Sequence, residues 1–474
     1  MLEGQGITEV LLSETETTPD FRIDAEFHKP APDDNPRYEY VPIGKVLRSS
    51  QYGISIEMNE DGEGIPIYRM NEMTAMLCNA DILKSANISE AEAKPFVLES
   101  RDVLFNRTNS QRWVGRTGLY LPFSDEKRIF ASYLVRFVPD DSKVLPEYLT
   151  AFLNSSLGVW DVKRRARISI NQSNVNPEEV KAIRIPLLSL TFQAKIAAQF
   201  TQAHSQIQNS NWLYAQAERL ILCALKLDNW QPPITNNYEV RSRFVRDAAR
   251  LDADHFHPKY RALLDHVQRH AKRCEILSEL CPLVDHGKQP PYAEDGQAFL
   301  FSQKYIGKTG INYDFPNAED AIRIDPQFVA DNEKYLLRRN DLVHYSVGAY
   351  IGRTQVFLED EPLAMPGSFI TLIRADKTKV HPIYLGCVLN SIVGQMQTDQ
   401  MKSASAQPYI YPKDIRDFIV PFVDEATEKE IVRCVEESHQ SRRRAKTLLE
   451  RAKRAVEVAI EQDEAAGLKV LEVE

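Results

Sequence analysis

Paired cysteines are missing from this sequence. Its 474 residues include six cysteines, and none of them belongs to a CxxC pair. Even Cys274 and Cys281 are spaced too widely for a zinc knuckle. The spacing argues against a zinc knuckle and favours free thiols in the reducing environment of the cytoplasm.

Long apolar runs are missing as well. No stretch is long enough to span a bilayer, and the acidic residues 1–20 lack the basic region and apolar core of a signal peptide. Hydrophobic residues make up 43% of the chain and charged residues 26%, as in soluble globular proteins. We therefore expect a soluble, cytoplasmic protein of about two to four domains that does not associate with a membrane.

The motifs of common enzymes are also lacking. There is no P-loop, no GxSxG motif and no pair of carboxylates with a telling spacing. KQPPY, residues 288–292, resembles the (D/N)PPY motif of adenine methyltransferases, but Gln289 takes the first position and no glycine-rich cofactor loop precedes it. His266 and His270 lack the glutamate of zinc proteases, which favours surface histidines. The sequence predicts a binding protein, not an enzyme, without cofactor or metal.

The net charge of −9 argues at face value against a nucleic-acid partner, but it is unevenly distributed. Residues 1–35 hold nine acidic and two basic residues, and residues 455–474 hold six and one, so residues 36–454 carry +3. Residues 101–136 hold seven basic and three acidic residues. Local patches of this kind can bind phosphate despite an acidic total, although charge alone favours ordinary solvated surface.

The chain repeats itself. Three pairs of segments recur in the same order: RIDAEF (22–27) and RLDADHF (250–256), WVGRTGLYL (113–121) and YIGRTQVFL (350–358), and LPEYLTAFLNSSLG (145–158) and VHPIYLGCVLNSIVG (380–394). The last two pairs are offset by 237 and 236 residues. The chain therefore contains two copies of one unit, which suits the reading of two related sites better than a single active site.

Each copy begins with a globular part, residues 36–190 and 272–424. Short apolar runs alternate there with turn signals, which predicts an α+β globule. The clearest helix, 146–158, has Gly158 as its expected C-cap.

A long helix follows each globule. Apolar or small residues recur at 4–3–4 spacing over 191–226, interrupted by Ser210, and the seam returns in register over 426–461. A shared heptad seam predicts two helices that pack on each other as a coiled coil, although Arg442 interrupts it. The alternative is two separate amphipathic helices, each lying on its own globule.

An amide-rich run, Asn171 to Asn176, lies between the basic segment 164–167 and an expected strand, 183–187. Asn and Gln side chains can read adenine edges, whereas arginines beside them hold phosphates. Amides that only bond to their own loop are the alternative. We expect this run to lie at a DNA interface.

Taken together, these segments resemble the specificity subunit of type I restriction–modification enzymes. The resemblance covers nearly the whole chain and rests on the following pieces: DVLFNRTNSQRWVGRTG, FASYLVRF and RISINQSNVNPEEVKAIRIPLL in the first copy, DLVHYSVGAYIGRT and SAQPYIYPKDIRDFIVPF in the second. In the second copy Gln407-Pro408-Tyr409-Ile410 replaces Asn171-Gln172-Ser173-Asn174, so a contact made by the lost amides is in doubt there.

The resemblance implies two target-recognition domains of mixed α/β structure, each reading one half of a bipartite double-stranded DNA site. It implies that the long helices form an antiparallel coiled coil and set the distance between the half-sites. It also implies docking of methyltransferase subunits, two copies in our interpretation, and of restriction–translocase subunits. A coiled-coil scaffold without DNA binding and a self-contained adenine methyltransferase are the alternatives.

The expected domain boundaries follow the repeat: 1–190, N-terminal segment and first recognition domain; 191–228, first long helix; 229–424, linker and second recognition domain; 425–465, second long helix; 466–474, acidic tail. The expected DNA contacts are basic, amide and aromatic side chains of the two globules: Arg69, Arg101, Asn106, Arg107, Asn109, Gln111, Arg112, Arg116, Arg164, Arg165, Arg167, Asn171, Gln172, Asn174, Lys288, Gln289, Gln303, Lys304, Arg338, His344, Tyr345, Tyr350, Arg353, Ser405 and Gln407. The most divergent loops, FNRTNSQRW (105–113) and HYSVGAY (344–350), are expected to give the two halves different specificities.

Overall fold

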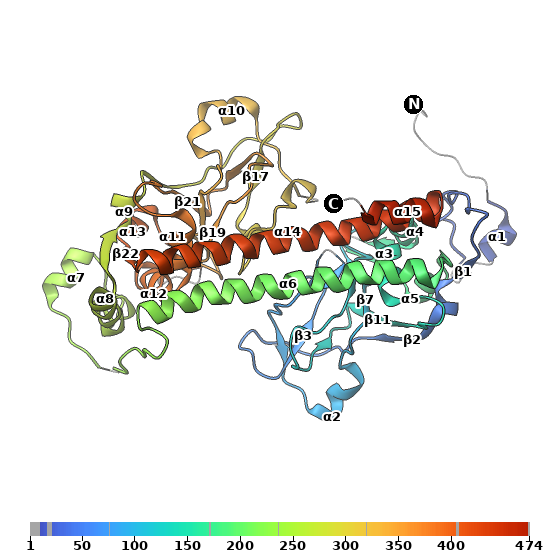
Figure 1. Cartoon of the computed structure of the whole chain (residues 1–474), viewed down its shortest axis with the longest axis horizontal. Helices are drawn as coiled ribbons and strands as arrows, with labels where there is room; N and C mark the ends of the chain where they lie inside the picture. Colours follow the sequence, from blue (N-terminus) through green and yellow to red (C-terminus); the bar gives the residue numbers. More distant parts are fainter. Residues whose placement is uncertain are drawn as a thin grey trace. The chain divides into compact units, whose positions relative to one another are not determined.

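The computed structural model describes residues 10–16, 21–74, 76–169, 172–235, 237–318, 320–403 and 407–472 (Figure 1). The chain forms two compact units: unit 1 comprises residues 1–208 and 442–474, and unit 2 comprises residues 209–441. Both boundaries fall inside a long helix, either α6 (Leu190–Ala224) or α14 (Glu425–Glu461), so each unit contains part of both helices.

Unit 1 is built from short strands and helices in the following order: α1 (Leu12–Glu16), β1 (Tyr40–Pro42), β2 (Leu47–Tyr52), β3 (Ile65–Tyr68), β4 (Met73–Thr74), β5 (Leu77–Cys78), β6 (Ser85–Ala86), α2 (Glu90–Ala93), β7 (Val103–Asn106), β8 (Thr108–Asn109), β9 (Thr117–Leu119), β10 (Ile129–Phe130), β11 (Leu134–Pro139), α3 (Pro146–Asn154), α4 (Ser156–Arg165), β12 (Arg167–Ser169), β13 (Gln172–Asn174), α5 (Pro177–Lys181), β14 (Arg184–Pro186) and, after the long helices, α15 (Glu464–Glu472).

Unit 2 follows the same plan with different additions: α7 (Ser242–Ala248), α8 (Pro258–His270), β15 (Arg273–Ile276), α9 (Leu277–Leu280), β16 (Leu283–His286), β17 (Phe299–Phe301), α10 (Pro326–Asp331), β18 (Leu342–Tyr345), β19 (Thr354–Val356), β20 (Ala364–Pro366), β21 (Ile370–Arg374), α11 (Pro382–Asn390), α12 (Ile392–Met401), α13 (Pro412–Arg416) and β22 (Ile419–Phe422).

The main sheets of the two units share a four-strand core. In unit 1 the strand order is β2-β11-β7-β9-β5-β4, and in unit 2 it is β16-β21-β18-β19. The strands β2, β11, β7 and β9 match β16, β21, β18 and β19 in sequence order and are antiparallel to their neighbours in both units. The fold class expected from the sequence, α+β globules each joined to a long helix, is confirmed.

One buried helix in each unit packs against its sheet. Tyr148 of α3 is buried and donates its hydroxyl to the carbonyl oxygen of Pro186 at 2.7 Å, and Tyr384 of α11 donates to that of Pro421 at 2.8 Å. The tyrosine hydroxyl thereby satisfies a buried carbonyl at the same place in both cores.

The helix expected over 146–158 is in fact two helices. Ser155 ends α3 and caps α4, accepting from the backbone N–H of Gly158 at 3.2 Å. Gly158 is therefore not a C-cap. A Cβ at this position would lie 2.0 Å from the carbonyl oxygen of Phe152, so glycine allows α4 to turn closely over the end of α3. Gly394 has the same role in unit 2, 2.2 Å from the carbonyl oxygen of Leu389.

The long helices pack against each other in antiparallel fashion in both units. In unit 1 the first half of α6 and the second half of α14 share one core, which includes Phe200 and Val456. In unit 2 the second half of α6 and the first half of α14 share another, which includes Ile221 and Ile431. Ser210, which interrupts the apolar seam, lies 2.8 Å from the buried hydroxyl of Ser438, so polar residues satisfy each other there.

Residues 466–474 were expected to form an acidic tail, but α15 covers most of them and packs on unit 1. Gly467 lies against Phe192 and Ala455, where a Cβ would come within 2.9 and 2.7 Å of their atoms. Within the described part of the chain, no helix combines the length and the apolar character needed to cross a membrane.

Candidate nucleic-acid interface

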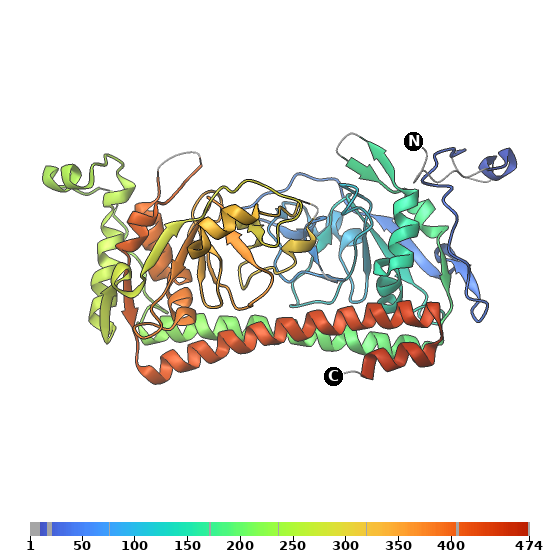
Figure 2. The same ribbon diagram turned by 90° about the horizontal axis from the view of Figure 1, so that it is seen from above.

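A small sheet in unit 1 brings the amide-rich run beside the divergent loop. Strand β13 pairs with β12 and with β8, so that Ser173 lies opposite Asn109 and Asn174 lies opposite Arg167. The N–H of Val175 also donates to the carbonyl oxygen of Arg107 at 2.9 Å. Figure 2 shows the β12–β13 hairpin at the side of unit 1 away from the long helices. The backbone therefore joins two segments that we selected separately from the sequence.

Several side chains of this sheet reach solvent. Arg167 keeps 50% of its side chain exposed while its Nη2 lies 3.4 Å from Glu179, and Gln172 is exposed on the hairpin. The Arg107 guanidinium lies over the exposed ring of Tyr52, 5.1 Å from its centroid. These arginine, amide and ring groups have the chemistry of a DNA surface, with cations for phosphates and amides for base edges.

One lysine forms hydrogen bonds with backbone carbonyl oxygens of the loop after β8. Lys163 of α4 donates its ammonium group to the carbonyl oxygens of Gln111, Arg112 and Val114, the last two at 2.7 and 2.8 Å. Trp113 lies beside two guanidinium groups, with Cζ of Arg116 at 3.3 Å and Cζ of Arg112 at 4.8 Å from its ring centroid. The loop therefore presents arginines stacked on a tryptophan.

The divergent loop of unit 2 is also paired with the segment that follows the second helix of its helix pair, α12. Val347 forms a β-bridge with Tyr409, and the N–H of Gly348 donates to the carbonyl oxygen of Pro408 at 2.9 Å. Arg353 stacks on Tyr350, with Cζ 4.3 Å from the ring centroid. The pairing of the two loops is therefore kept although aromatic residues replace the amides of unit 1.

Some predicted contact residues are buried in the structure. Asn106 and His344 have no exposed surface, and Tyr345 is 8% exposed. These residues were expected in the divergent loops, but Asn106 belongs to β7, and His344 and Tyr345 belong to β18. The Asn106 amide donates to the carbonyl oxygen of Trp113 at 3.2 Å, and His344 lies 2.8 Å from the Thr354 hydroxyl. A side chain without exposed surface cannot touch DNA in this conformation.

Other predicted contact residues are committed to internal ion pairs. Arg101 bonds to Glu147 and Asp141, and these carboxylates, Glu147 foremost, raise the pKa of its guanidinium. Arg69 lies 2.6 Å from Glu72, which is almost fully buried. These two arginines are placed to support the fold rather than to bind phosphate.

The arginines of α4 are engaged in a similar way. Arg164 and Arg165 share Asp161 at 2.6 and 2.9 Å, and burial lowers the pKa of Arg165. Our expectation that these two contact DNA does not fit their placement.

The remaining predicted residues are dispersed over unit 2. Gln289 is exposed and donates to the Tyr292 hydroxyl at 2.9 Å, and Lys288 lies over the Tyr335 ring. Lys304 pairs with Asp320, while Gln303 is partly exposed. Arg338 and Gln407 are exposed as well. Asn171 and Ser405 lie outside the described residues.

Exposed rings at both surfaces escaped the sequence analysis. Tyr52 and Tyr133 in unit 1, and Phe369, Tyr409 and Tyr411 in unit 2, are 36% to 50% exposed. The repeat could have revealed two of them, because Tyr133 and Phe369 lie 236 residues apart. Their carbonyl oxygens accept equivalent backbone hydrogen bonds of 3.1 Å, from the N–H of Arg107 in unit 1 and of Ser346 in unit 2.

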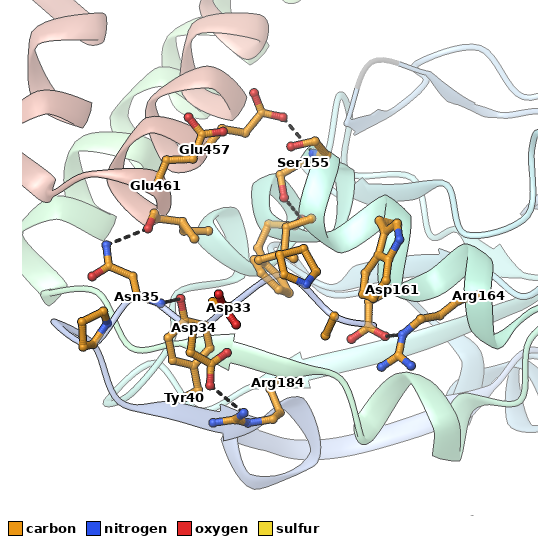
Figure 3. Close-up of a pocket in the computed structure, with 18 of the residues that line it drawn as sticks. Asp33, Asp34, Asn35, Tyr40, Ser155, Asp161, Arg164, Arg184, Glu457 and Glu461 are labelled. Carbon is orange, nitrogen blue, oxygen red and sulfur yellow. Dashed lines mark hydrogen bonds and ion pairs between the residues drawn. The ribbon is translucent and has the colours of Figure 1, made fainter. Parts of the chain in front are cut away.

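A cavity of about 810 Å³ in unit 1 has a different character (Figure 3). Five acidic residues and four arginines line it, and several of them are paired, Asp34 with Arg184 at 2.6 Å and Asp161 with Arg164 at 2.6 Å. Charges of both signs line the cavity, so it has no excess of positive charge to attract the phosphate backbone of DNA. Within the described ranges, no three His, Cys, Asp or Glu side chains are grouped to hold a metal ion.

Two curated proteins are similar to parts of the chain. The MjaX type I restriction enzyme specificity subunit, as it is named, of Methanocaldococcus jannaschii is 26% identical over 163 residues, 34% of this chain and 38% of that protein. The EcoKI type I restriction enzyme specificity subunit of Escherichia coli is 25% identical over 166 residues, 35% and 36% of the two chains. Both relatives are type I specificity subunits. The resemblance seen in the sequence motifs is thereby confirmed, with the matched part spanning less than two fifths of either relative.

No family model matches the chain. Among solved structures, the type I restriction–modification S subunit from M. genitalium aligns over 94% of this chain and 98% of its own, with 13% identity and a TM-score of 0.38.

Proposed function

We propose that this chain is the non-catalytic DNA-specificity subunit of a type I restriction–modification enzyme. Each unit binds one half of a bipartite double-stranded site, and the chain docks the methyltransferase and restriction subunits that carry out the chemistry. S-adenosylmethionine belongs to the methyltransferase partners in this proposal. The recognition domains correspond to residues 1–190 and 229–424, and the long helices to 191–228 and 425–465.

One observation supports this proposal above the others. In both units the backbone pairs the divergent loop with the segment that follows α4 or α12. The paired residues are Asn109 and Ser173 in unit 1, and Val347 and Tyr409 in unit 2. The scaffold is the same, whereas the side chains that it presents differ. A duplicated frame with divergent exposed side chains is what two related but different half-sites require.

The proposal is tested by expressing the chain with its methyltransferase subunits and mapping methylation in host DNA at single-molecule resolution. We expect one bipartite motif with two different halves. Replacing residues 105–113 by 344–350, with thermal unfolding as a check on folding, should change one half of the motif and leave the other intact. A change in both halves, or in neither with the fold intact, contradicts the assignment of one half-site to each unit.

Two alternatives give different results. A coiled-coil scaffold without DNA binding would give no shift of any duplex in a mobility assay with the methyltransferase subunits present. A self-contained adenine methyltransferase would crosslink to S-adenosylmethionine as the isolated chain under ultraviolet light, whereas we expect no crosslink.

A further inference from the structure

The apolar ring of Phe369 in unit 2 is half exposed to solvent, although it has no polar group that water could hydrogen-bond. Its exposed fraction is 50%, and its carbonyl oxygen accepts the N–H of Ser346 at 3.1 Å. The carbonyl oxygen of Ser346 in turn accepts the N–H of Ile410 at 3.0 Å. Ser346 of the divergent loop is therefore bonded to Phe369 on one side and to Ile410 on the other.

Two exposed tyrosines flank Ile410, whose N–H donates to the Ser346 carbonyl oxygen. Tyr409 and Tyr411 are 36% and 45% exposed, and their ring centroids lie 4.8 Å apart. Lys413 lies over the Tyr411 ring, with Nζ 5.6 Å from its centroid, so one cation borders the rings. We call Phe369, Tyr409 and Tyr411 the ring surface of unit 2.

The same place in unit 1 has more charge. Arg107 corresponds to Ser346, because both donate to the carbonyl oxygen of the exposed aromatic residue, Tyr133 or Phe369. Ser346 is fully buried and bonds to the Thr371 hydroxyl at 2.7 Å, so the guanidinium of unit 1 has been replaced by an internal hydrogen bond. The counterpart of Arg167 at an offset of 236 is also a serine. Unit 2 thus has serines at the positions of these two arginines, so less positive charge borders its exposed rings.

Base chemistry identifies what a phenylalanine ring can recognise in a duplex. The major-groove edges carry hydrogen-bonding groups, and the apolar group among them is the 5-methyl of thymine. We propose that the ring surface of unit 2 packs against thymine 5-methyl groups in its half-site, with Phe369 as a specificity-determining residue. This proposal rests on the DNA-recognition function proposed above.

The first test uses the unaltered chain with its methyltransferase subunits and the mapped duplex. Thymines of the half-site assigned to unit 2 are replaced by deoxyuridine, which lacks only the methyl group. We expect affinity to fall about fourfold for each contacted methyl, as for the loss of one buried methylene-sized group. The same replacement in the other half-site provides the duplex control.

The second test uses Phe369→Ala, with Tyr133→Ala as the matched variant in unit 1. Phe369→Ala should bind the thymine duplex more weakly and should no longer distinguish it from the deoxyuridine duplex. Tyr133→Ala should keep that distinction. The deoxyuridine comparison requires no variant, so it decides the matter even if Phe369→Ala is unstable.

Three results overturn the proposal: a unit 2 half-site without thymine on either strand, unchanged affinity for its deoxyuridine form, or a folded Phe369→Ala protein that still distinguishes the duplexes. In each case sequence-specific binding of the mapped duplex persists, so the proposed function stands. Absence of any specific binding contradicts the proposed function itself.

Discussion

Arg22 donates from Nη1 to the carbonyl oxygen of Arg165 at 2.7 Å, at the C-terminal end of α4. Asp24 holds the guanidinium in place through two bonds, of 2.8 and 2.9 Å. The repeated segment does the same in unit 2, where Arg250 donates to the carbonyl oxygen of Met401 at 2.8 Å. The Arg-x-Asp motif thus satisfies helix-end carbonyls just before the polypeptide reaches the candidate interface.

Removing Arg22 should destabilise unit 1. Arg22 is 8% exposed and also lies 3.3 Å from Glu179, which is 1% exposed, so Arg22→Met leaves a buried carboxylate short of a partner. We expect the free energy of unfolding to fall by about 3 kcal/mol, the order found when one partner of a buried ion pair is removed. Urea titration measures the change. Arg37→Met, at a site 60% exposed, is the control and should change it by less than about 0.5 kcal/mol.

Two arginines of the same basic segment should respond differently to removal. Arg112→Ala should weaken binding to all duplexes alike and make the logarithmic salt dependence shallower by about one unit, as expected when one phosphate contact is lost. Arg101→Ala should leave the salt dependence unchanged and lower stability instead, since Arg101 is paired with Glu147 and Asp141. Binding titrations at several salt concentrations separate the two effects. Equal salt slopes for both variants would mean that the loop at Arg112 is ordinary solvated surface.

The repeat is the reason why much of the fold was predictable. An offset of 236 or 237 residues was sufficient to predict two copies of one α+β globule, and the two sheets share their four-strand core. The heptad seam predicted the helix pair for a similar reason, because Ile221 and Val456 lie at seam positions that recur in register in both helices, and both are fully buried.

The candidate site was less predictable, because charge and residue type do not reveal partners. Arg101 was selected as part of a basic segment, yet its partner Glu147 comes 46 residues later in the sequence. Asn106 and His344 were assigned to loops because the ends of β7 and β18 have no local signal. Phe369 was passed over because a lone aromatic residue in an apolar run normally faces the core.

Lys163 should determine how well the divergent loop of unit 1 is positioned. Its ammonium group binds the carbonyl oxygens of Arg112 and Val114, and its counterpart at an offset of 236 is Asp399, a carboxylate that does not donate to carbonyl oxygens. We expect Lys163→Met to speed amide exchange within residues 110–116 and to weaken binding at the first half-site about tenfold, roughly 1.4 kcal/mol. Lys163→Arg should recover much of the loss. If exchange is unchanged while binding falls, Lys163 contacts DNA instead of positioning the loop.

Stability should depend on pH through His344. Burial lowers the pKa of this histidine to about 4 from a usual value of 6.5. Above pH 6.5 the imidazole is neutral in both the folded and the unfolded state, so it has no effect on stability there. Below pH 6.5 the unfolded chain binds a proton that the folded chain does not, and stability therefore falls as the pH decreases toward 4. The loss should reach about 2 kcal/mol at pH 5 and about 3 kcal/mol at pH 4.

The first copy of the repeat supplies the variant that tests this dependence. Phe105 occupies the position of His344 and is also fully buried, while Thr117 donates its hydroxyl to the Gly115 carbonyl oxygen as Thr354 does to that of Gly352. His344→Phe should therefore fold, and its free energy of unfolding should fall about 2 kcal/mol less than that of the unaltered chain between pH 7.5 and pH 5. Urea titration at the two pH values measures the difference, with His270→Gln as a control on a histidine that is not fully buried. If both proteins lose the same stability over this range, His344 takes up its proton in the folded state as readily as in the unfolded chain, and the pocket around it opens to water.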